Sequence, residues 1–216
     1  PTSVETANPS LFKSSVLPSR DLAPVMGIDR MQMYLVARPT LPANSIKELI
    51  ALAKGKPGQL NYASSGPGTP PHLAGELFKQ STDTFITHVP YRGSAPALQD
   101  VMAGQADFVL DPGIAFPHIR SGKVKLLGVA SEHTSPFFPD APTYADLGVK
   151  NASLDIWFGL WGPANLPASV TERLSREVAK ALAAPALKER FNALGAEPAA
   201  LETSAFRKLL ADEGRS

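Results

Sequence analysis

Cysteine is absent from all 216 residues of the sequence, which excludes a disulfide framework, a cysteine zinc site and a thiol nucleophile. Charge is sparse as well, because charged residues make up 19% of the chain and the formal net charge is only +1. With no run of basic residues, neither nucleic acid nor a membrane surface is an expected partner. No stretch approaches the roughly 18 consecutive apolar residues of a membrane span. What remains is an ordinary globular composition, sufficient for one domain or two small ones.

A leader pattern is also missing, because no charged segment followed by an apolar one stands at the start of the sequence. We therefore expect no signal peptide in this chain, and we expect the chain to be a piece of something longer. The lack of cysteine leaves the compartment open, since an exported bacterial protein need not contain any.

The most informative stretch is residues 61–78, which combines a short β-compatible segment, a loop of small residues and a helix start. Thr69 is the expected N-cap, and two prolines follow it where a missing N–H costs nothing. Gly66 and Gly68 let the backbone approach a ligand closely. Helix-start N–H groups carry partial positive charge, so the stretch predicts either an anion site or simply a tight connection between strand and helix.

The same region does not match the known motifs for a phosphate-containing cofactor or a complete metal site. No Lys-Ser or Lys-Thr pair follows Gly68, and Pro71 occupies the third glycine position of the dinucleotide fingerprint. His72 and Glu76 are spaced like half of a metal site, but no third ligand stands out, so a plain helical pair is favoured. We expect neither a cofactor nor a metal.

Strands and helices alternate through the middle of the chain. A capping box at Ser45 and Glu48 predicts a helix start, and the four strands that follow enclose three short helices. Such alternation predicts right-handed βαβ units and a mainly parallel sheet, which brings loops 64–69, 91–94 and 111–113 to its carboxyl edge. The expected strands are 31–38, 60–63, 84–90, 106–110 and 124–130, and the expected helices after the first are 71–80, 94–103 and one that ends at Gly122.

The flanking regions are predicted from local patterns. Residues 21–27 look like an extended connector, and Thr143 is expected to cap a short helix that stops at Gly148. Residues 154–163 are the most strand-like stretch of the chain. Three helices are expected after it, at 167–183, 185–194 and 203–213, the first of them amphipathic.

Several of these segments, in this order, are similar to one known family. The similar segments are residues 41–54, 57–70, 72–78, 88–98, 157–160 and 195–198. They resemble the solute-binding receptors of tripartite tricarboxylate transporters, the Bug-type extracytoplasmic receptors. The resemblance covers almost the whole chain, but the family's opening strand and its proline- and glycine-rich loop have no counterpart here.

The resemblance implies a type II periplasmic-binding-protein fold, an α/β fold of two domains joined by crossover strands that close like a Venus flytrap. Residues 37–129 would form the second domain, and residues 1–36 with 130–216 would form the remainder of an incomplete, N-terminally truncated first domain. Trp157, Phe158 and Trp161 would pack beneath the hinge. The implied function is periplasmic capture of a small carboxylate for a tripartite tricarboxylate-type transporter, without catalysis.

The resemblance also implies the site and the partners. The ligand would be a mono- or dicarboxylate or an acidic amino acid, and the protein partners would be the membrane transporter subunits. Arg92 pairs with an anion or is simply a surface residue, and Asp111 either contacts the ligand or caps the next helix. The expected ligand-binding residues are Ser3, Ser64, Ser65, Gly68, Thr69, Arg92, Gly93, Ser94 and Asp111.

Two other functions were weighed against this one. Ser64 or Ser65, with His72 or His88 and Asp111, supplies the atom types of a hydrolase triad, but Gly-x-Ser-x-Gly is absent and nothing fixes a base against a nucleophile. His88 is therefore interpreted as structural. The other alternative is a truncated, self-associating interaction module without ligand capture, favoured by sheet edges that the missing segment would leave exposed.

Overall fold

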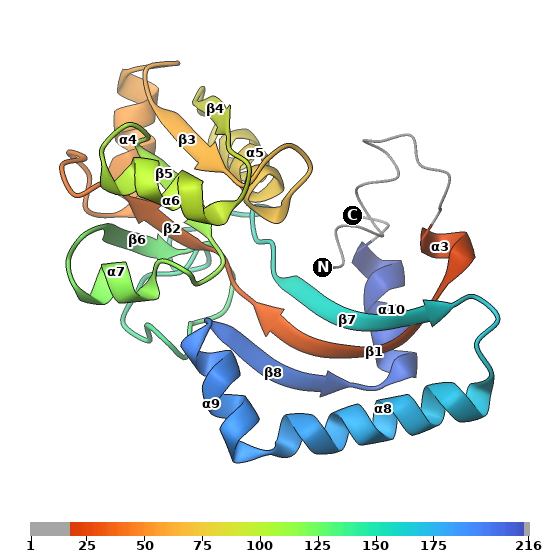
Figure 1. Ribbon diagram of the computed structural model, residues 1–216. Helices are drawn as coiled ribbons and strands as arrows, with labels where there is room; N and C mark the ends of the chain where they lie inside the picture. The colour runs from red at the N-terminus through yellow and green to blue at the C-terminus, as the bar shows by residue number, and fades with distance from the viewer. Residues whose placement is uncertain (1–17, 214–216) are drawn as a thin grey trace. The chain divides into compact units, whose positions relative to one another are not determined.

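The computed structural model describes residues 18–213, in which the chain forms two compact units (Figure 1). Unit 2 is the continuous segment Gln32–Asp155, and unit 1 combines the chain up to Met31 with the chain from Ile156 onward. Unit 2 extends beyond the predicted 37–129 on both sides. Among the described residues, no helix is both long and apolar enough to cross a membrane.

Unit 2 contains a five-stranded sheet in the order β4-β3-β5-β2-β6. β3 pairs in parallel with β4 and β5, whereas β2 lies antiparallel between β5 and β6. The predicted parallel arrangement is thus confirmed for the three strands that carry the site loops, and the sheet as a whole is mixed. The strands are β2 (Tyr34–Ala37), β3 (Asn61–Ser64), β4 (Thr87–Pro90), β5 (Phe108–Asp111) and β6 (Lys125–Val129).

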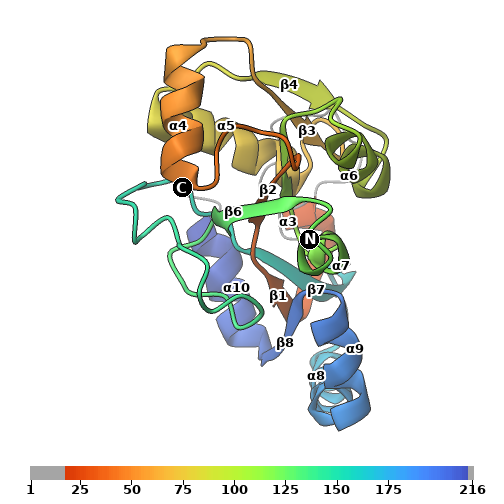
Figure 2. The same ribbon diagram turned by 90° about the vertical axis from the view of Figure 1, so that its left-hand side faces the viewer.

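Helices cover both faces of this sheet, as the edge-on view of Figure 2 shows. On one face, Phe78 of α5 packs against Phe108 of β5 with ring centroids 6.3 Å apart. On the other face, Ala63 and Val109 belong to a buried cluster that includes Val101 of α6 and Phe116 of α7. The helices are α4 (Ile46–Gly55), α5 (Pro70–Thr82), α6 (Ser94–Met102) and α7 (Phe116–Arg120).

The predicted capping box begins α4. Ser45 accepts a hydrogen bond from the Glu48 amide at 3.2 Å, and the Glu48 carboxylate accepts one from the amide of Asn44 at 2.7 Å. Two otherwise unpaired backbone donors are therefore satisfied, which fixes the start of the helix.

Unit 1 is built on an antiparallel sheet in the order β7-β1-β8. Phe206 of α10 packs on one face, where an added Cβ at Gly159 would lie 2.3 Å from its ring, and Trp161 meets the same ring edge-on at 5.3 Å. The elements of unit 1 are α3 (Pro18–Asp21), β1 (Leu22–Met31), β7 (Ile156–Pro163), α8 (Ala168–Ala183), α9 (Pro185–Ala193), β8 (Ala196–Leu201) and α10 (Thr203–Glu213).

Several local predictions were wrong. The expected connector at 21–27 is most of the long strand β1, and the strand expected at 31–38 is limited to β2. The strand expected at 84–90 begins only at Thr87. Residues 143–148 form turns rather than a helix. Thr143 and Asp146 form the bonds of a helix start, but the amides of Leu147 and Gly148 bond to carbonyls only three residues back. β8 was not predicted at all.

Candidate functional site

Three loops lie side by side at one edge of the sheet of unit 2. They follow β4, β3 and β5, which are parallel neighbours, so each loop leaves the sheet at its carboxyl edge. The Tyr91 amide donates a hydrogen bond of 2.9 Å to the carbonyl of Ser64, which joins the first two loops. The predicted grouping of loops 64–69, 91–94 and 111–113 is confirmed.

The loop after β3 is braced from within. The Ser64 hydroxyl accepts the Gly66 amide at 3.1 Å, and the Gly66 carbonyl accepts the Thr69 hydroxyl at 2.6 Å and the Thr69 amide at 3.3 Å. Gly66 has a φ of 123°, and an added Cβ would lie 3.3 Å from the Tyr91 carbonyl, so only glycine fits comfortably. Of the three hydroxyls in the loop, only that of Ser65 forms no hydrogen bond within the described residues.

The start of α5 offers fewer free amides than the sequence suggests. Thr69 is the N-cap, as predicted, but its side chain donates to Gly66 instead of capping the helix. Pro70 and Pro71 have no N–H, and the Thr69 amide is already bonded. Within the described residues, the first turn therefore presents only the backbone amide of His72.

The start of α6 is better supplied with donors. Gly93 is its N-cap with a φ of 123°, and the amides of Ser94 and Ala95 form no hydrogen bond within the described part of the chain. Ser94 is half-buried, whereas Arg92 is exposed. An anion that meets this edge of the sheet therefore finds its free backbone donors mainly at α6.

Asp111 is buried at the end of β5 and holds the loop that leads to α7. One oxygen of its carboxylate accepts the amides of Gly113 and Ala115 at 2.7 and 2.9 Å. Burial raises the pKa of Asp111 to about 6, although both hydrogen bonds act in the opposite direction. Asp111 therefore braces the loop before α7 and does not cap the helix itself, and the predicted ligand contact stays a prediction.

Two histidines contact the loop after β3, and the sequence analysis did not bring them together. Ser64 and His88 Nε2 are joined by a hydrogen bond of 2.7 Å, and the Gly68 amide donates to His72 Nδ1 at 3.1 Å. The centroids of the two histidine rings are 4.3 Å apart. The only sequence signal was the position of His72 in the first helical turn, from which a side chain can reach back to the loop.

The atoms of the weighed hydrolase triad are not assembled. Ser64 and His88 are in contact, but Ser64 is fully buried and its hydroxyl already holds the Gly66 amide. The Asp111 carboxylate bonds to the loop before α7 instead of a histidine. A nucleophile must reach its substrate, so this serine is placed to support the loop.

The half metal site has a different role in the structure. Glu76 accepts hydrogen bonds from the Tyr62 hydroxyl at 2.7 Å and from Lys79 at 2.8 Å, while His72 is directed to Gly68. Burial alone would raise the pKa of Glu76, but the hydrogen bonds from Lys79 and Tyr62 outweigh it and lower the pKa. Among the described residues, no group of three or more His, Asp or Glu side chains could hold a metal ion.

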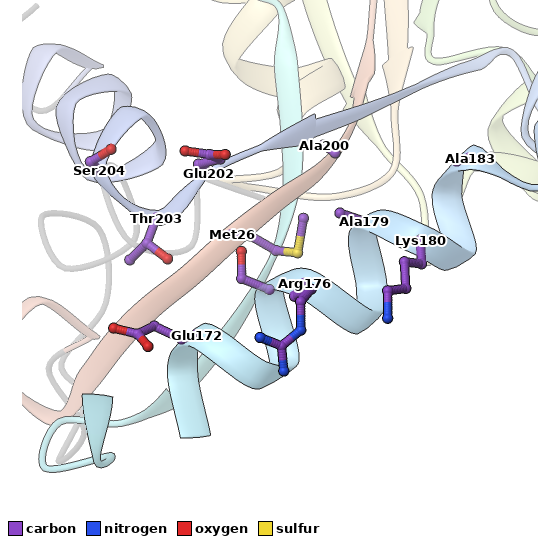
Figure 3. A pocket seen from close by; sticks show the side chains of 11 residues that line it. Met26, Glu172, Arg176, Ala179, Lys180, Ala183, Ala200, Glu202, Thr203 and Ser204 are labelled. Carbon is purple, nitrogen blue, oxygen red and sulfur yellow. The ribbon is translucent and has the colours of Figure 1, made fainter. Parts of the chain in front are cut away.

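Unit 1 also contains a surface groove. This groove of about 760 Å³ runs between Met26 of β1, one side of α8 and the start of α10 (Figure 3). Arg176 and Lys180 line this groove but extend away from Met26, and both bond to Glu177. The groove contains none of the predicted site residues. Ser3 lies outside the described residues.

Solved periplasmic binding proteins have a fold similar to that of this chain. BugD superposes with a TM-score of 0.86 at 30% identity, over 99% of this chain and 73% of that one. MatC from Rhodopseudomonas palustris, solved with bound malate, gives 0.87 at 28% identity over 99% and 74%. Rpa4515 from R. palustris, solved with adipate, gives 0.84 at 30% identity over 93% and 69%. The fold is therefore that of the periplasmic solute-binding proteins, as predicted.

The sequence comparisons narrow this class to one family. The profile of the tripartite tricarboxylate transporter family receptor matches residues 2–216. BugT of Bordetella pertussis is 35% identical over 195 residues, which are 89% of this chain and 60% of that protein. A second protein of the same organism is 35% identical over 194 residues, with the same coverage. The chain belongs to the tripartite tricarboxylate transporter receptor family, and it spans about 60% of the length of these curated relatives.

Proposed function

We propose that this protein is a periplasmic solute-binding receptor that captures a small organic carboxylate and delivers it to the membrane subunits of a tripartite tricarboxylate-type transporter. The ligand would be a mono- or dicarboxylate or an acidic amino acid. The receptor performs no covalent chemistry, because its role is to bind and release the ligand unchanged.

One observation carries this proposal. The half-buried Ser65 hydroxyl and the free amides of Ser94 and Ala95 belong to two touching loops at one sheet edge. These groups are hydrogen-bond donors, and a carboxylate accepts hydrogen bonds through both of its oxygens. The arrangement therefore suits a carboxylate better than a cation or an apolar ligand.

The relatives support the same ligand class. MatC was solved with malate and Rpa4515 with adipate, both at 28–30% identity to this chain. Both ligands are small dicarboxylates. Arg92, which is exposed at the same edge, would add an attractive charge without being required for contact.

The test is a thermal-shift titration of the purified protein with mono-, di- and tricarboxylates and with acidic amino acids. A ligand at about 100 times its Kd adds roughly 2.7 kcal/mol to stability, which gives a clear rise in melting temperature. We expect one compound or a small group to give a saturable shift. A cooperative melt that no compound shifts would contradict the proposal.

Matched variants localise the site. Ser65→Ala should weaken binding without affecting the melting temperature of the free protein, because its hydroxyl has no partner in the described structure. Thr69→Ala should affect both, since the Thr69 hydroxyl braces the loop. Ser169→Ala, on the exposed side of α8, is the control and should change neither. Binding that is insensitive to Ser65→Ala would place the ligand elsewhere.

A second candidate function, self-association, is favoured by α8. This 16-residue helix buries only Leu182, while Val170 and Leu174 on its apolar stripe remain 40% and 38% exposed. A second copy of the chain would cover this stripe. Light scattering tests this function: a dimer converted to a monomer by Leu174→Ser would support it, and a monomer at all concentrations would reject it.

A further inference from the structure

His72 positions the loop after β3 through one hydrogen bond in which the donor and the acceptor are known. The Gly68 backbone amide can only donate, so Nδ1 of His72 must accept with an unprotonated lone pair. Gly68 has a φ of 73°, so the loop at this point adopts a backbone conformation that few other residues tolerate. The neutral imidazole thus fixes the direction of an amide that would otherwise be available to a ligand.

His88 holds the same loop at a second point. It bonds to the Ser64 hydroxyl, which in turn accepts the Gly66 amide. The two alternate glycines of the loop are therefore each tied to one histidine, Gly68 directly and Gly66 through Ser64. Because the ring centroids are only 4.3 Å apart, a charge on one ring opposes a charge on the other.

The charged and titratable neighbours of the pair come from two elements, β3 and α5. The Tyr62 ring of β3 stacks on His88 at 4.9 Å, and α5 contributes Glu76 and Lys79. Burial lowers the pKa of His88, and His72 and Lys79 add to this effect while Glu76 opposes it. Glu76 is neutralised in part by its bonds to Lys79 and Tyr62. A proton on one ring therefore disfavours a second proton on the other.

Protonation of His72 at Nδ1 removes the acceptor of the Gly68 amide. The amide then points at an N–H group and is released from the ring. A carboxylate at this edge would gain both a free donor and a nearby positive charge. A bound anion, in turn, favours the charged imidazole, because binding and protonation are linked reciprocally.

We propose that His72 is a proton-coupled positioning residue, which on protonation releases the Gly68 amide to a bound carboxylate, so that ligand binding takes up a proton and strengthens as the pH falls. This inference rests on the proposed function only in its final step, because the bond between His72 and Gly68 exists without a ligand. The two steps are therefore tested separately.

The first experiment follows the Gly68 amide resonance by NMR in the ligand-free protein from about pH 8 to about pH 5.5. We expect this resonance to titrate together with the His72 ring in the wild type. In His72→Gln, the side chain can still accept the hydrogen bond from the Gly68 amide but cannot titrate. The pH dependence of the Gly68 resonance should therefore vanish. His118→Gln, in α7, is the matched control and should titrate like the wild type. A Gly68 resonance that stays constant while the His72 ring titrates in the wild type would overturn the inference.

The second experiment measures malate binding by calorimetry at about pH 8 and about pH 6, in buffers of different ionisation enthalpy. We expect about fivefold tighter binding at the lower pH with net proton uptake in the wild type and in His118→Gln, and neither effect in His72→Gln. Proton release, or uptake unchanged in His72→Gln, would overturn the coupling. If no carboxylate bound at any pH, the proposed function would fail, whereas the NMR titration would still decide whether His72 controls the loop.

Discussion

The ring of Tyr62 occupies the space that a side chain at position 75 would need. A Cβ added to Gly75 would lie 2.2 Å from Cε2 of Tyr62, which is far below van der Waals contact. Tyr62 cannot move away easily, because it is fully buried, stacks on Phe108 at 5.9 Å and bonds to Glu76. The approach of α5 to β3 therefore depends on the absence of a side chain at one position.

Gly75→Ala should consequently destabilise the protein by roughly 1 to 3 kcal/mol or more, through overpacking between α5 and β3. Chemical denaturation measures the loss. Gly55→Ala is the matched control, because Gly55 also lies in a helix but has nothing within 4 Å of its added Cβ. There alanine should be neutral or slightly stabilising. Equal effects of the two substitutions would contradict the packing described for Gly75.

Asp111 should make stability depend on pH. Its pKa in the folded protein is about 6, above the unfolded value of 3.8, so folding favours the protonated form. The resulting stabilisation is fully present below about pH 3.8 and is lost as the pH rises through about 6. Relative to Asp111→Asn, which cannot titrate, the wild type should gain about 1 kcal/mol between about pH 7 and about pH 5. Denaturation curves of both proteins at the two pH values test this, and a constant difference between them would refute it.

Asp107 should contribute strongly to the stability of unit 2. Its carboxylate accepts Arg38 Nε and the Asn61 amide, both at 2.9 Å, while its own amide donates to the Asn61 side chain. Because Asp107 is nearly buried, Asp107→Ala should cost roughly 2 to 4 kcal/mol in the free energy of unfolding. Glu177→Ala removes an exposed ion pair of α8 and should have no measurable effect. A similar, small change in both variants would show that the Asp107 bonds do not stabilise the fold.

Local signals predicted local structure well. The capping box at Ser45, the N-cap at Thr69 and the glycines of the loop depend on residues within a few positions of one another, so the sequence is sufficient to find them. The site loops were grouped correctly because parallel strands must release their loops at a common edge. Which donors within the loops are free of internal bonds could not be predicted, because it depends on contacts such as that from Gly68 to His72.

Features that depend on pairing between strands far apart in the sequence were not predicted. β8 contains three alanines and a proline, which have little strand propensity, and it becomes a strand through pairing with β1. β1 in turn has register shifts near Pro24 and Gly27, which disturb the alternation that marks a strand. The contact between Ser64 and His88 requires β3 and β4 to be neighbours in a particular register, which no short pattern in the sequence specifies.

The internal bracing of the loop after β3 has a consequence for how such a receptor can diversify. Gly66, Thr69 and Ser64 hold the backbone through bonds to one another, and none of these bonds involves the side chain of Ser65. In the proposed function, a substitution at position 65 would therefore exchange the group presented to a ligand while the loop keeps its shape. Ligand preference could then change during evolution without a change in loop architecture.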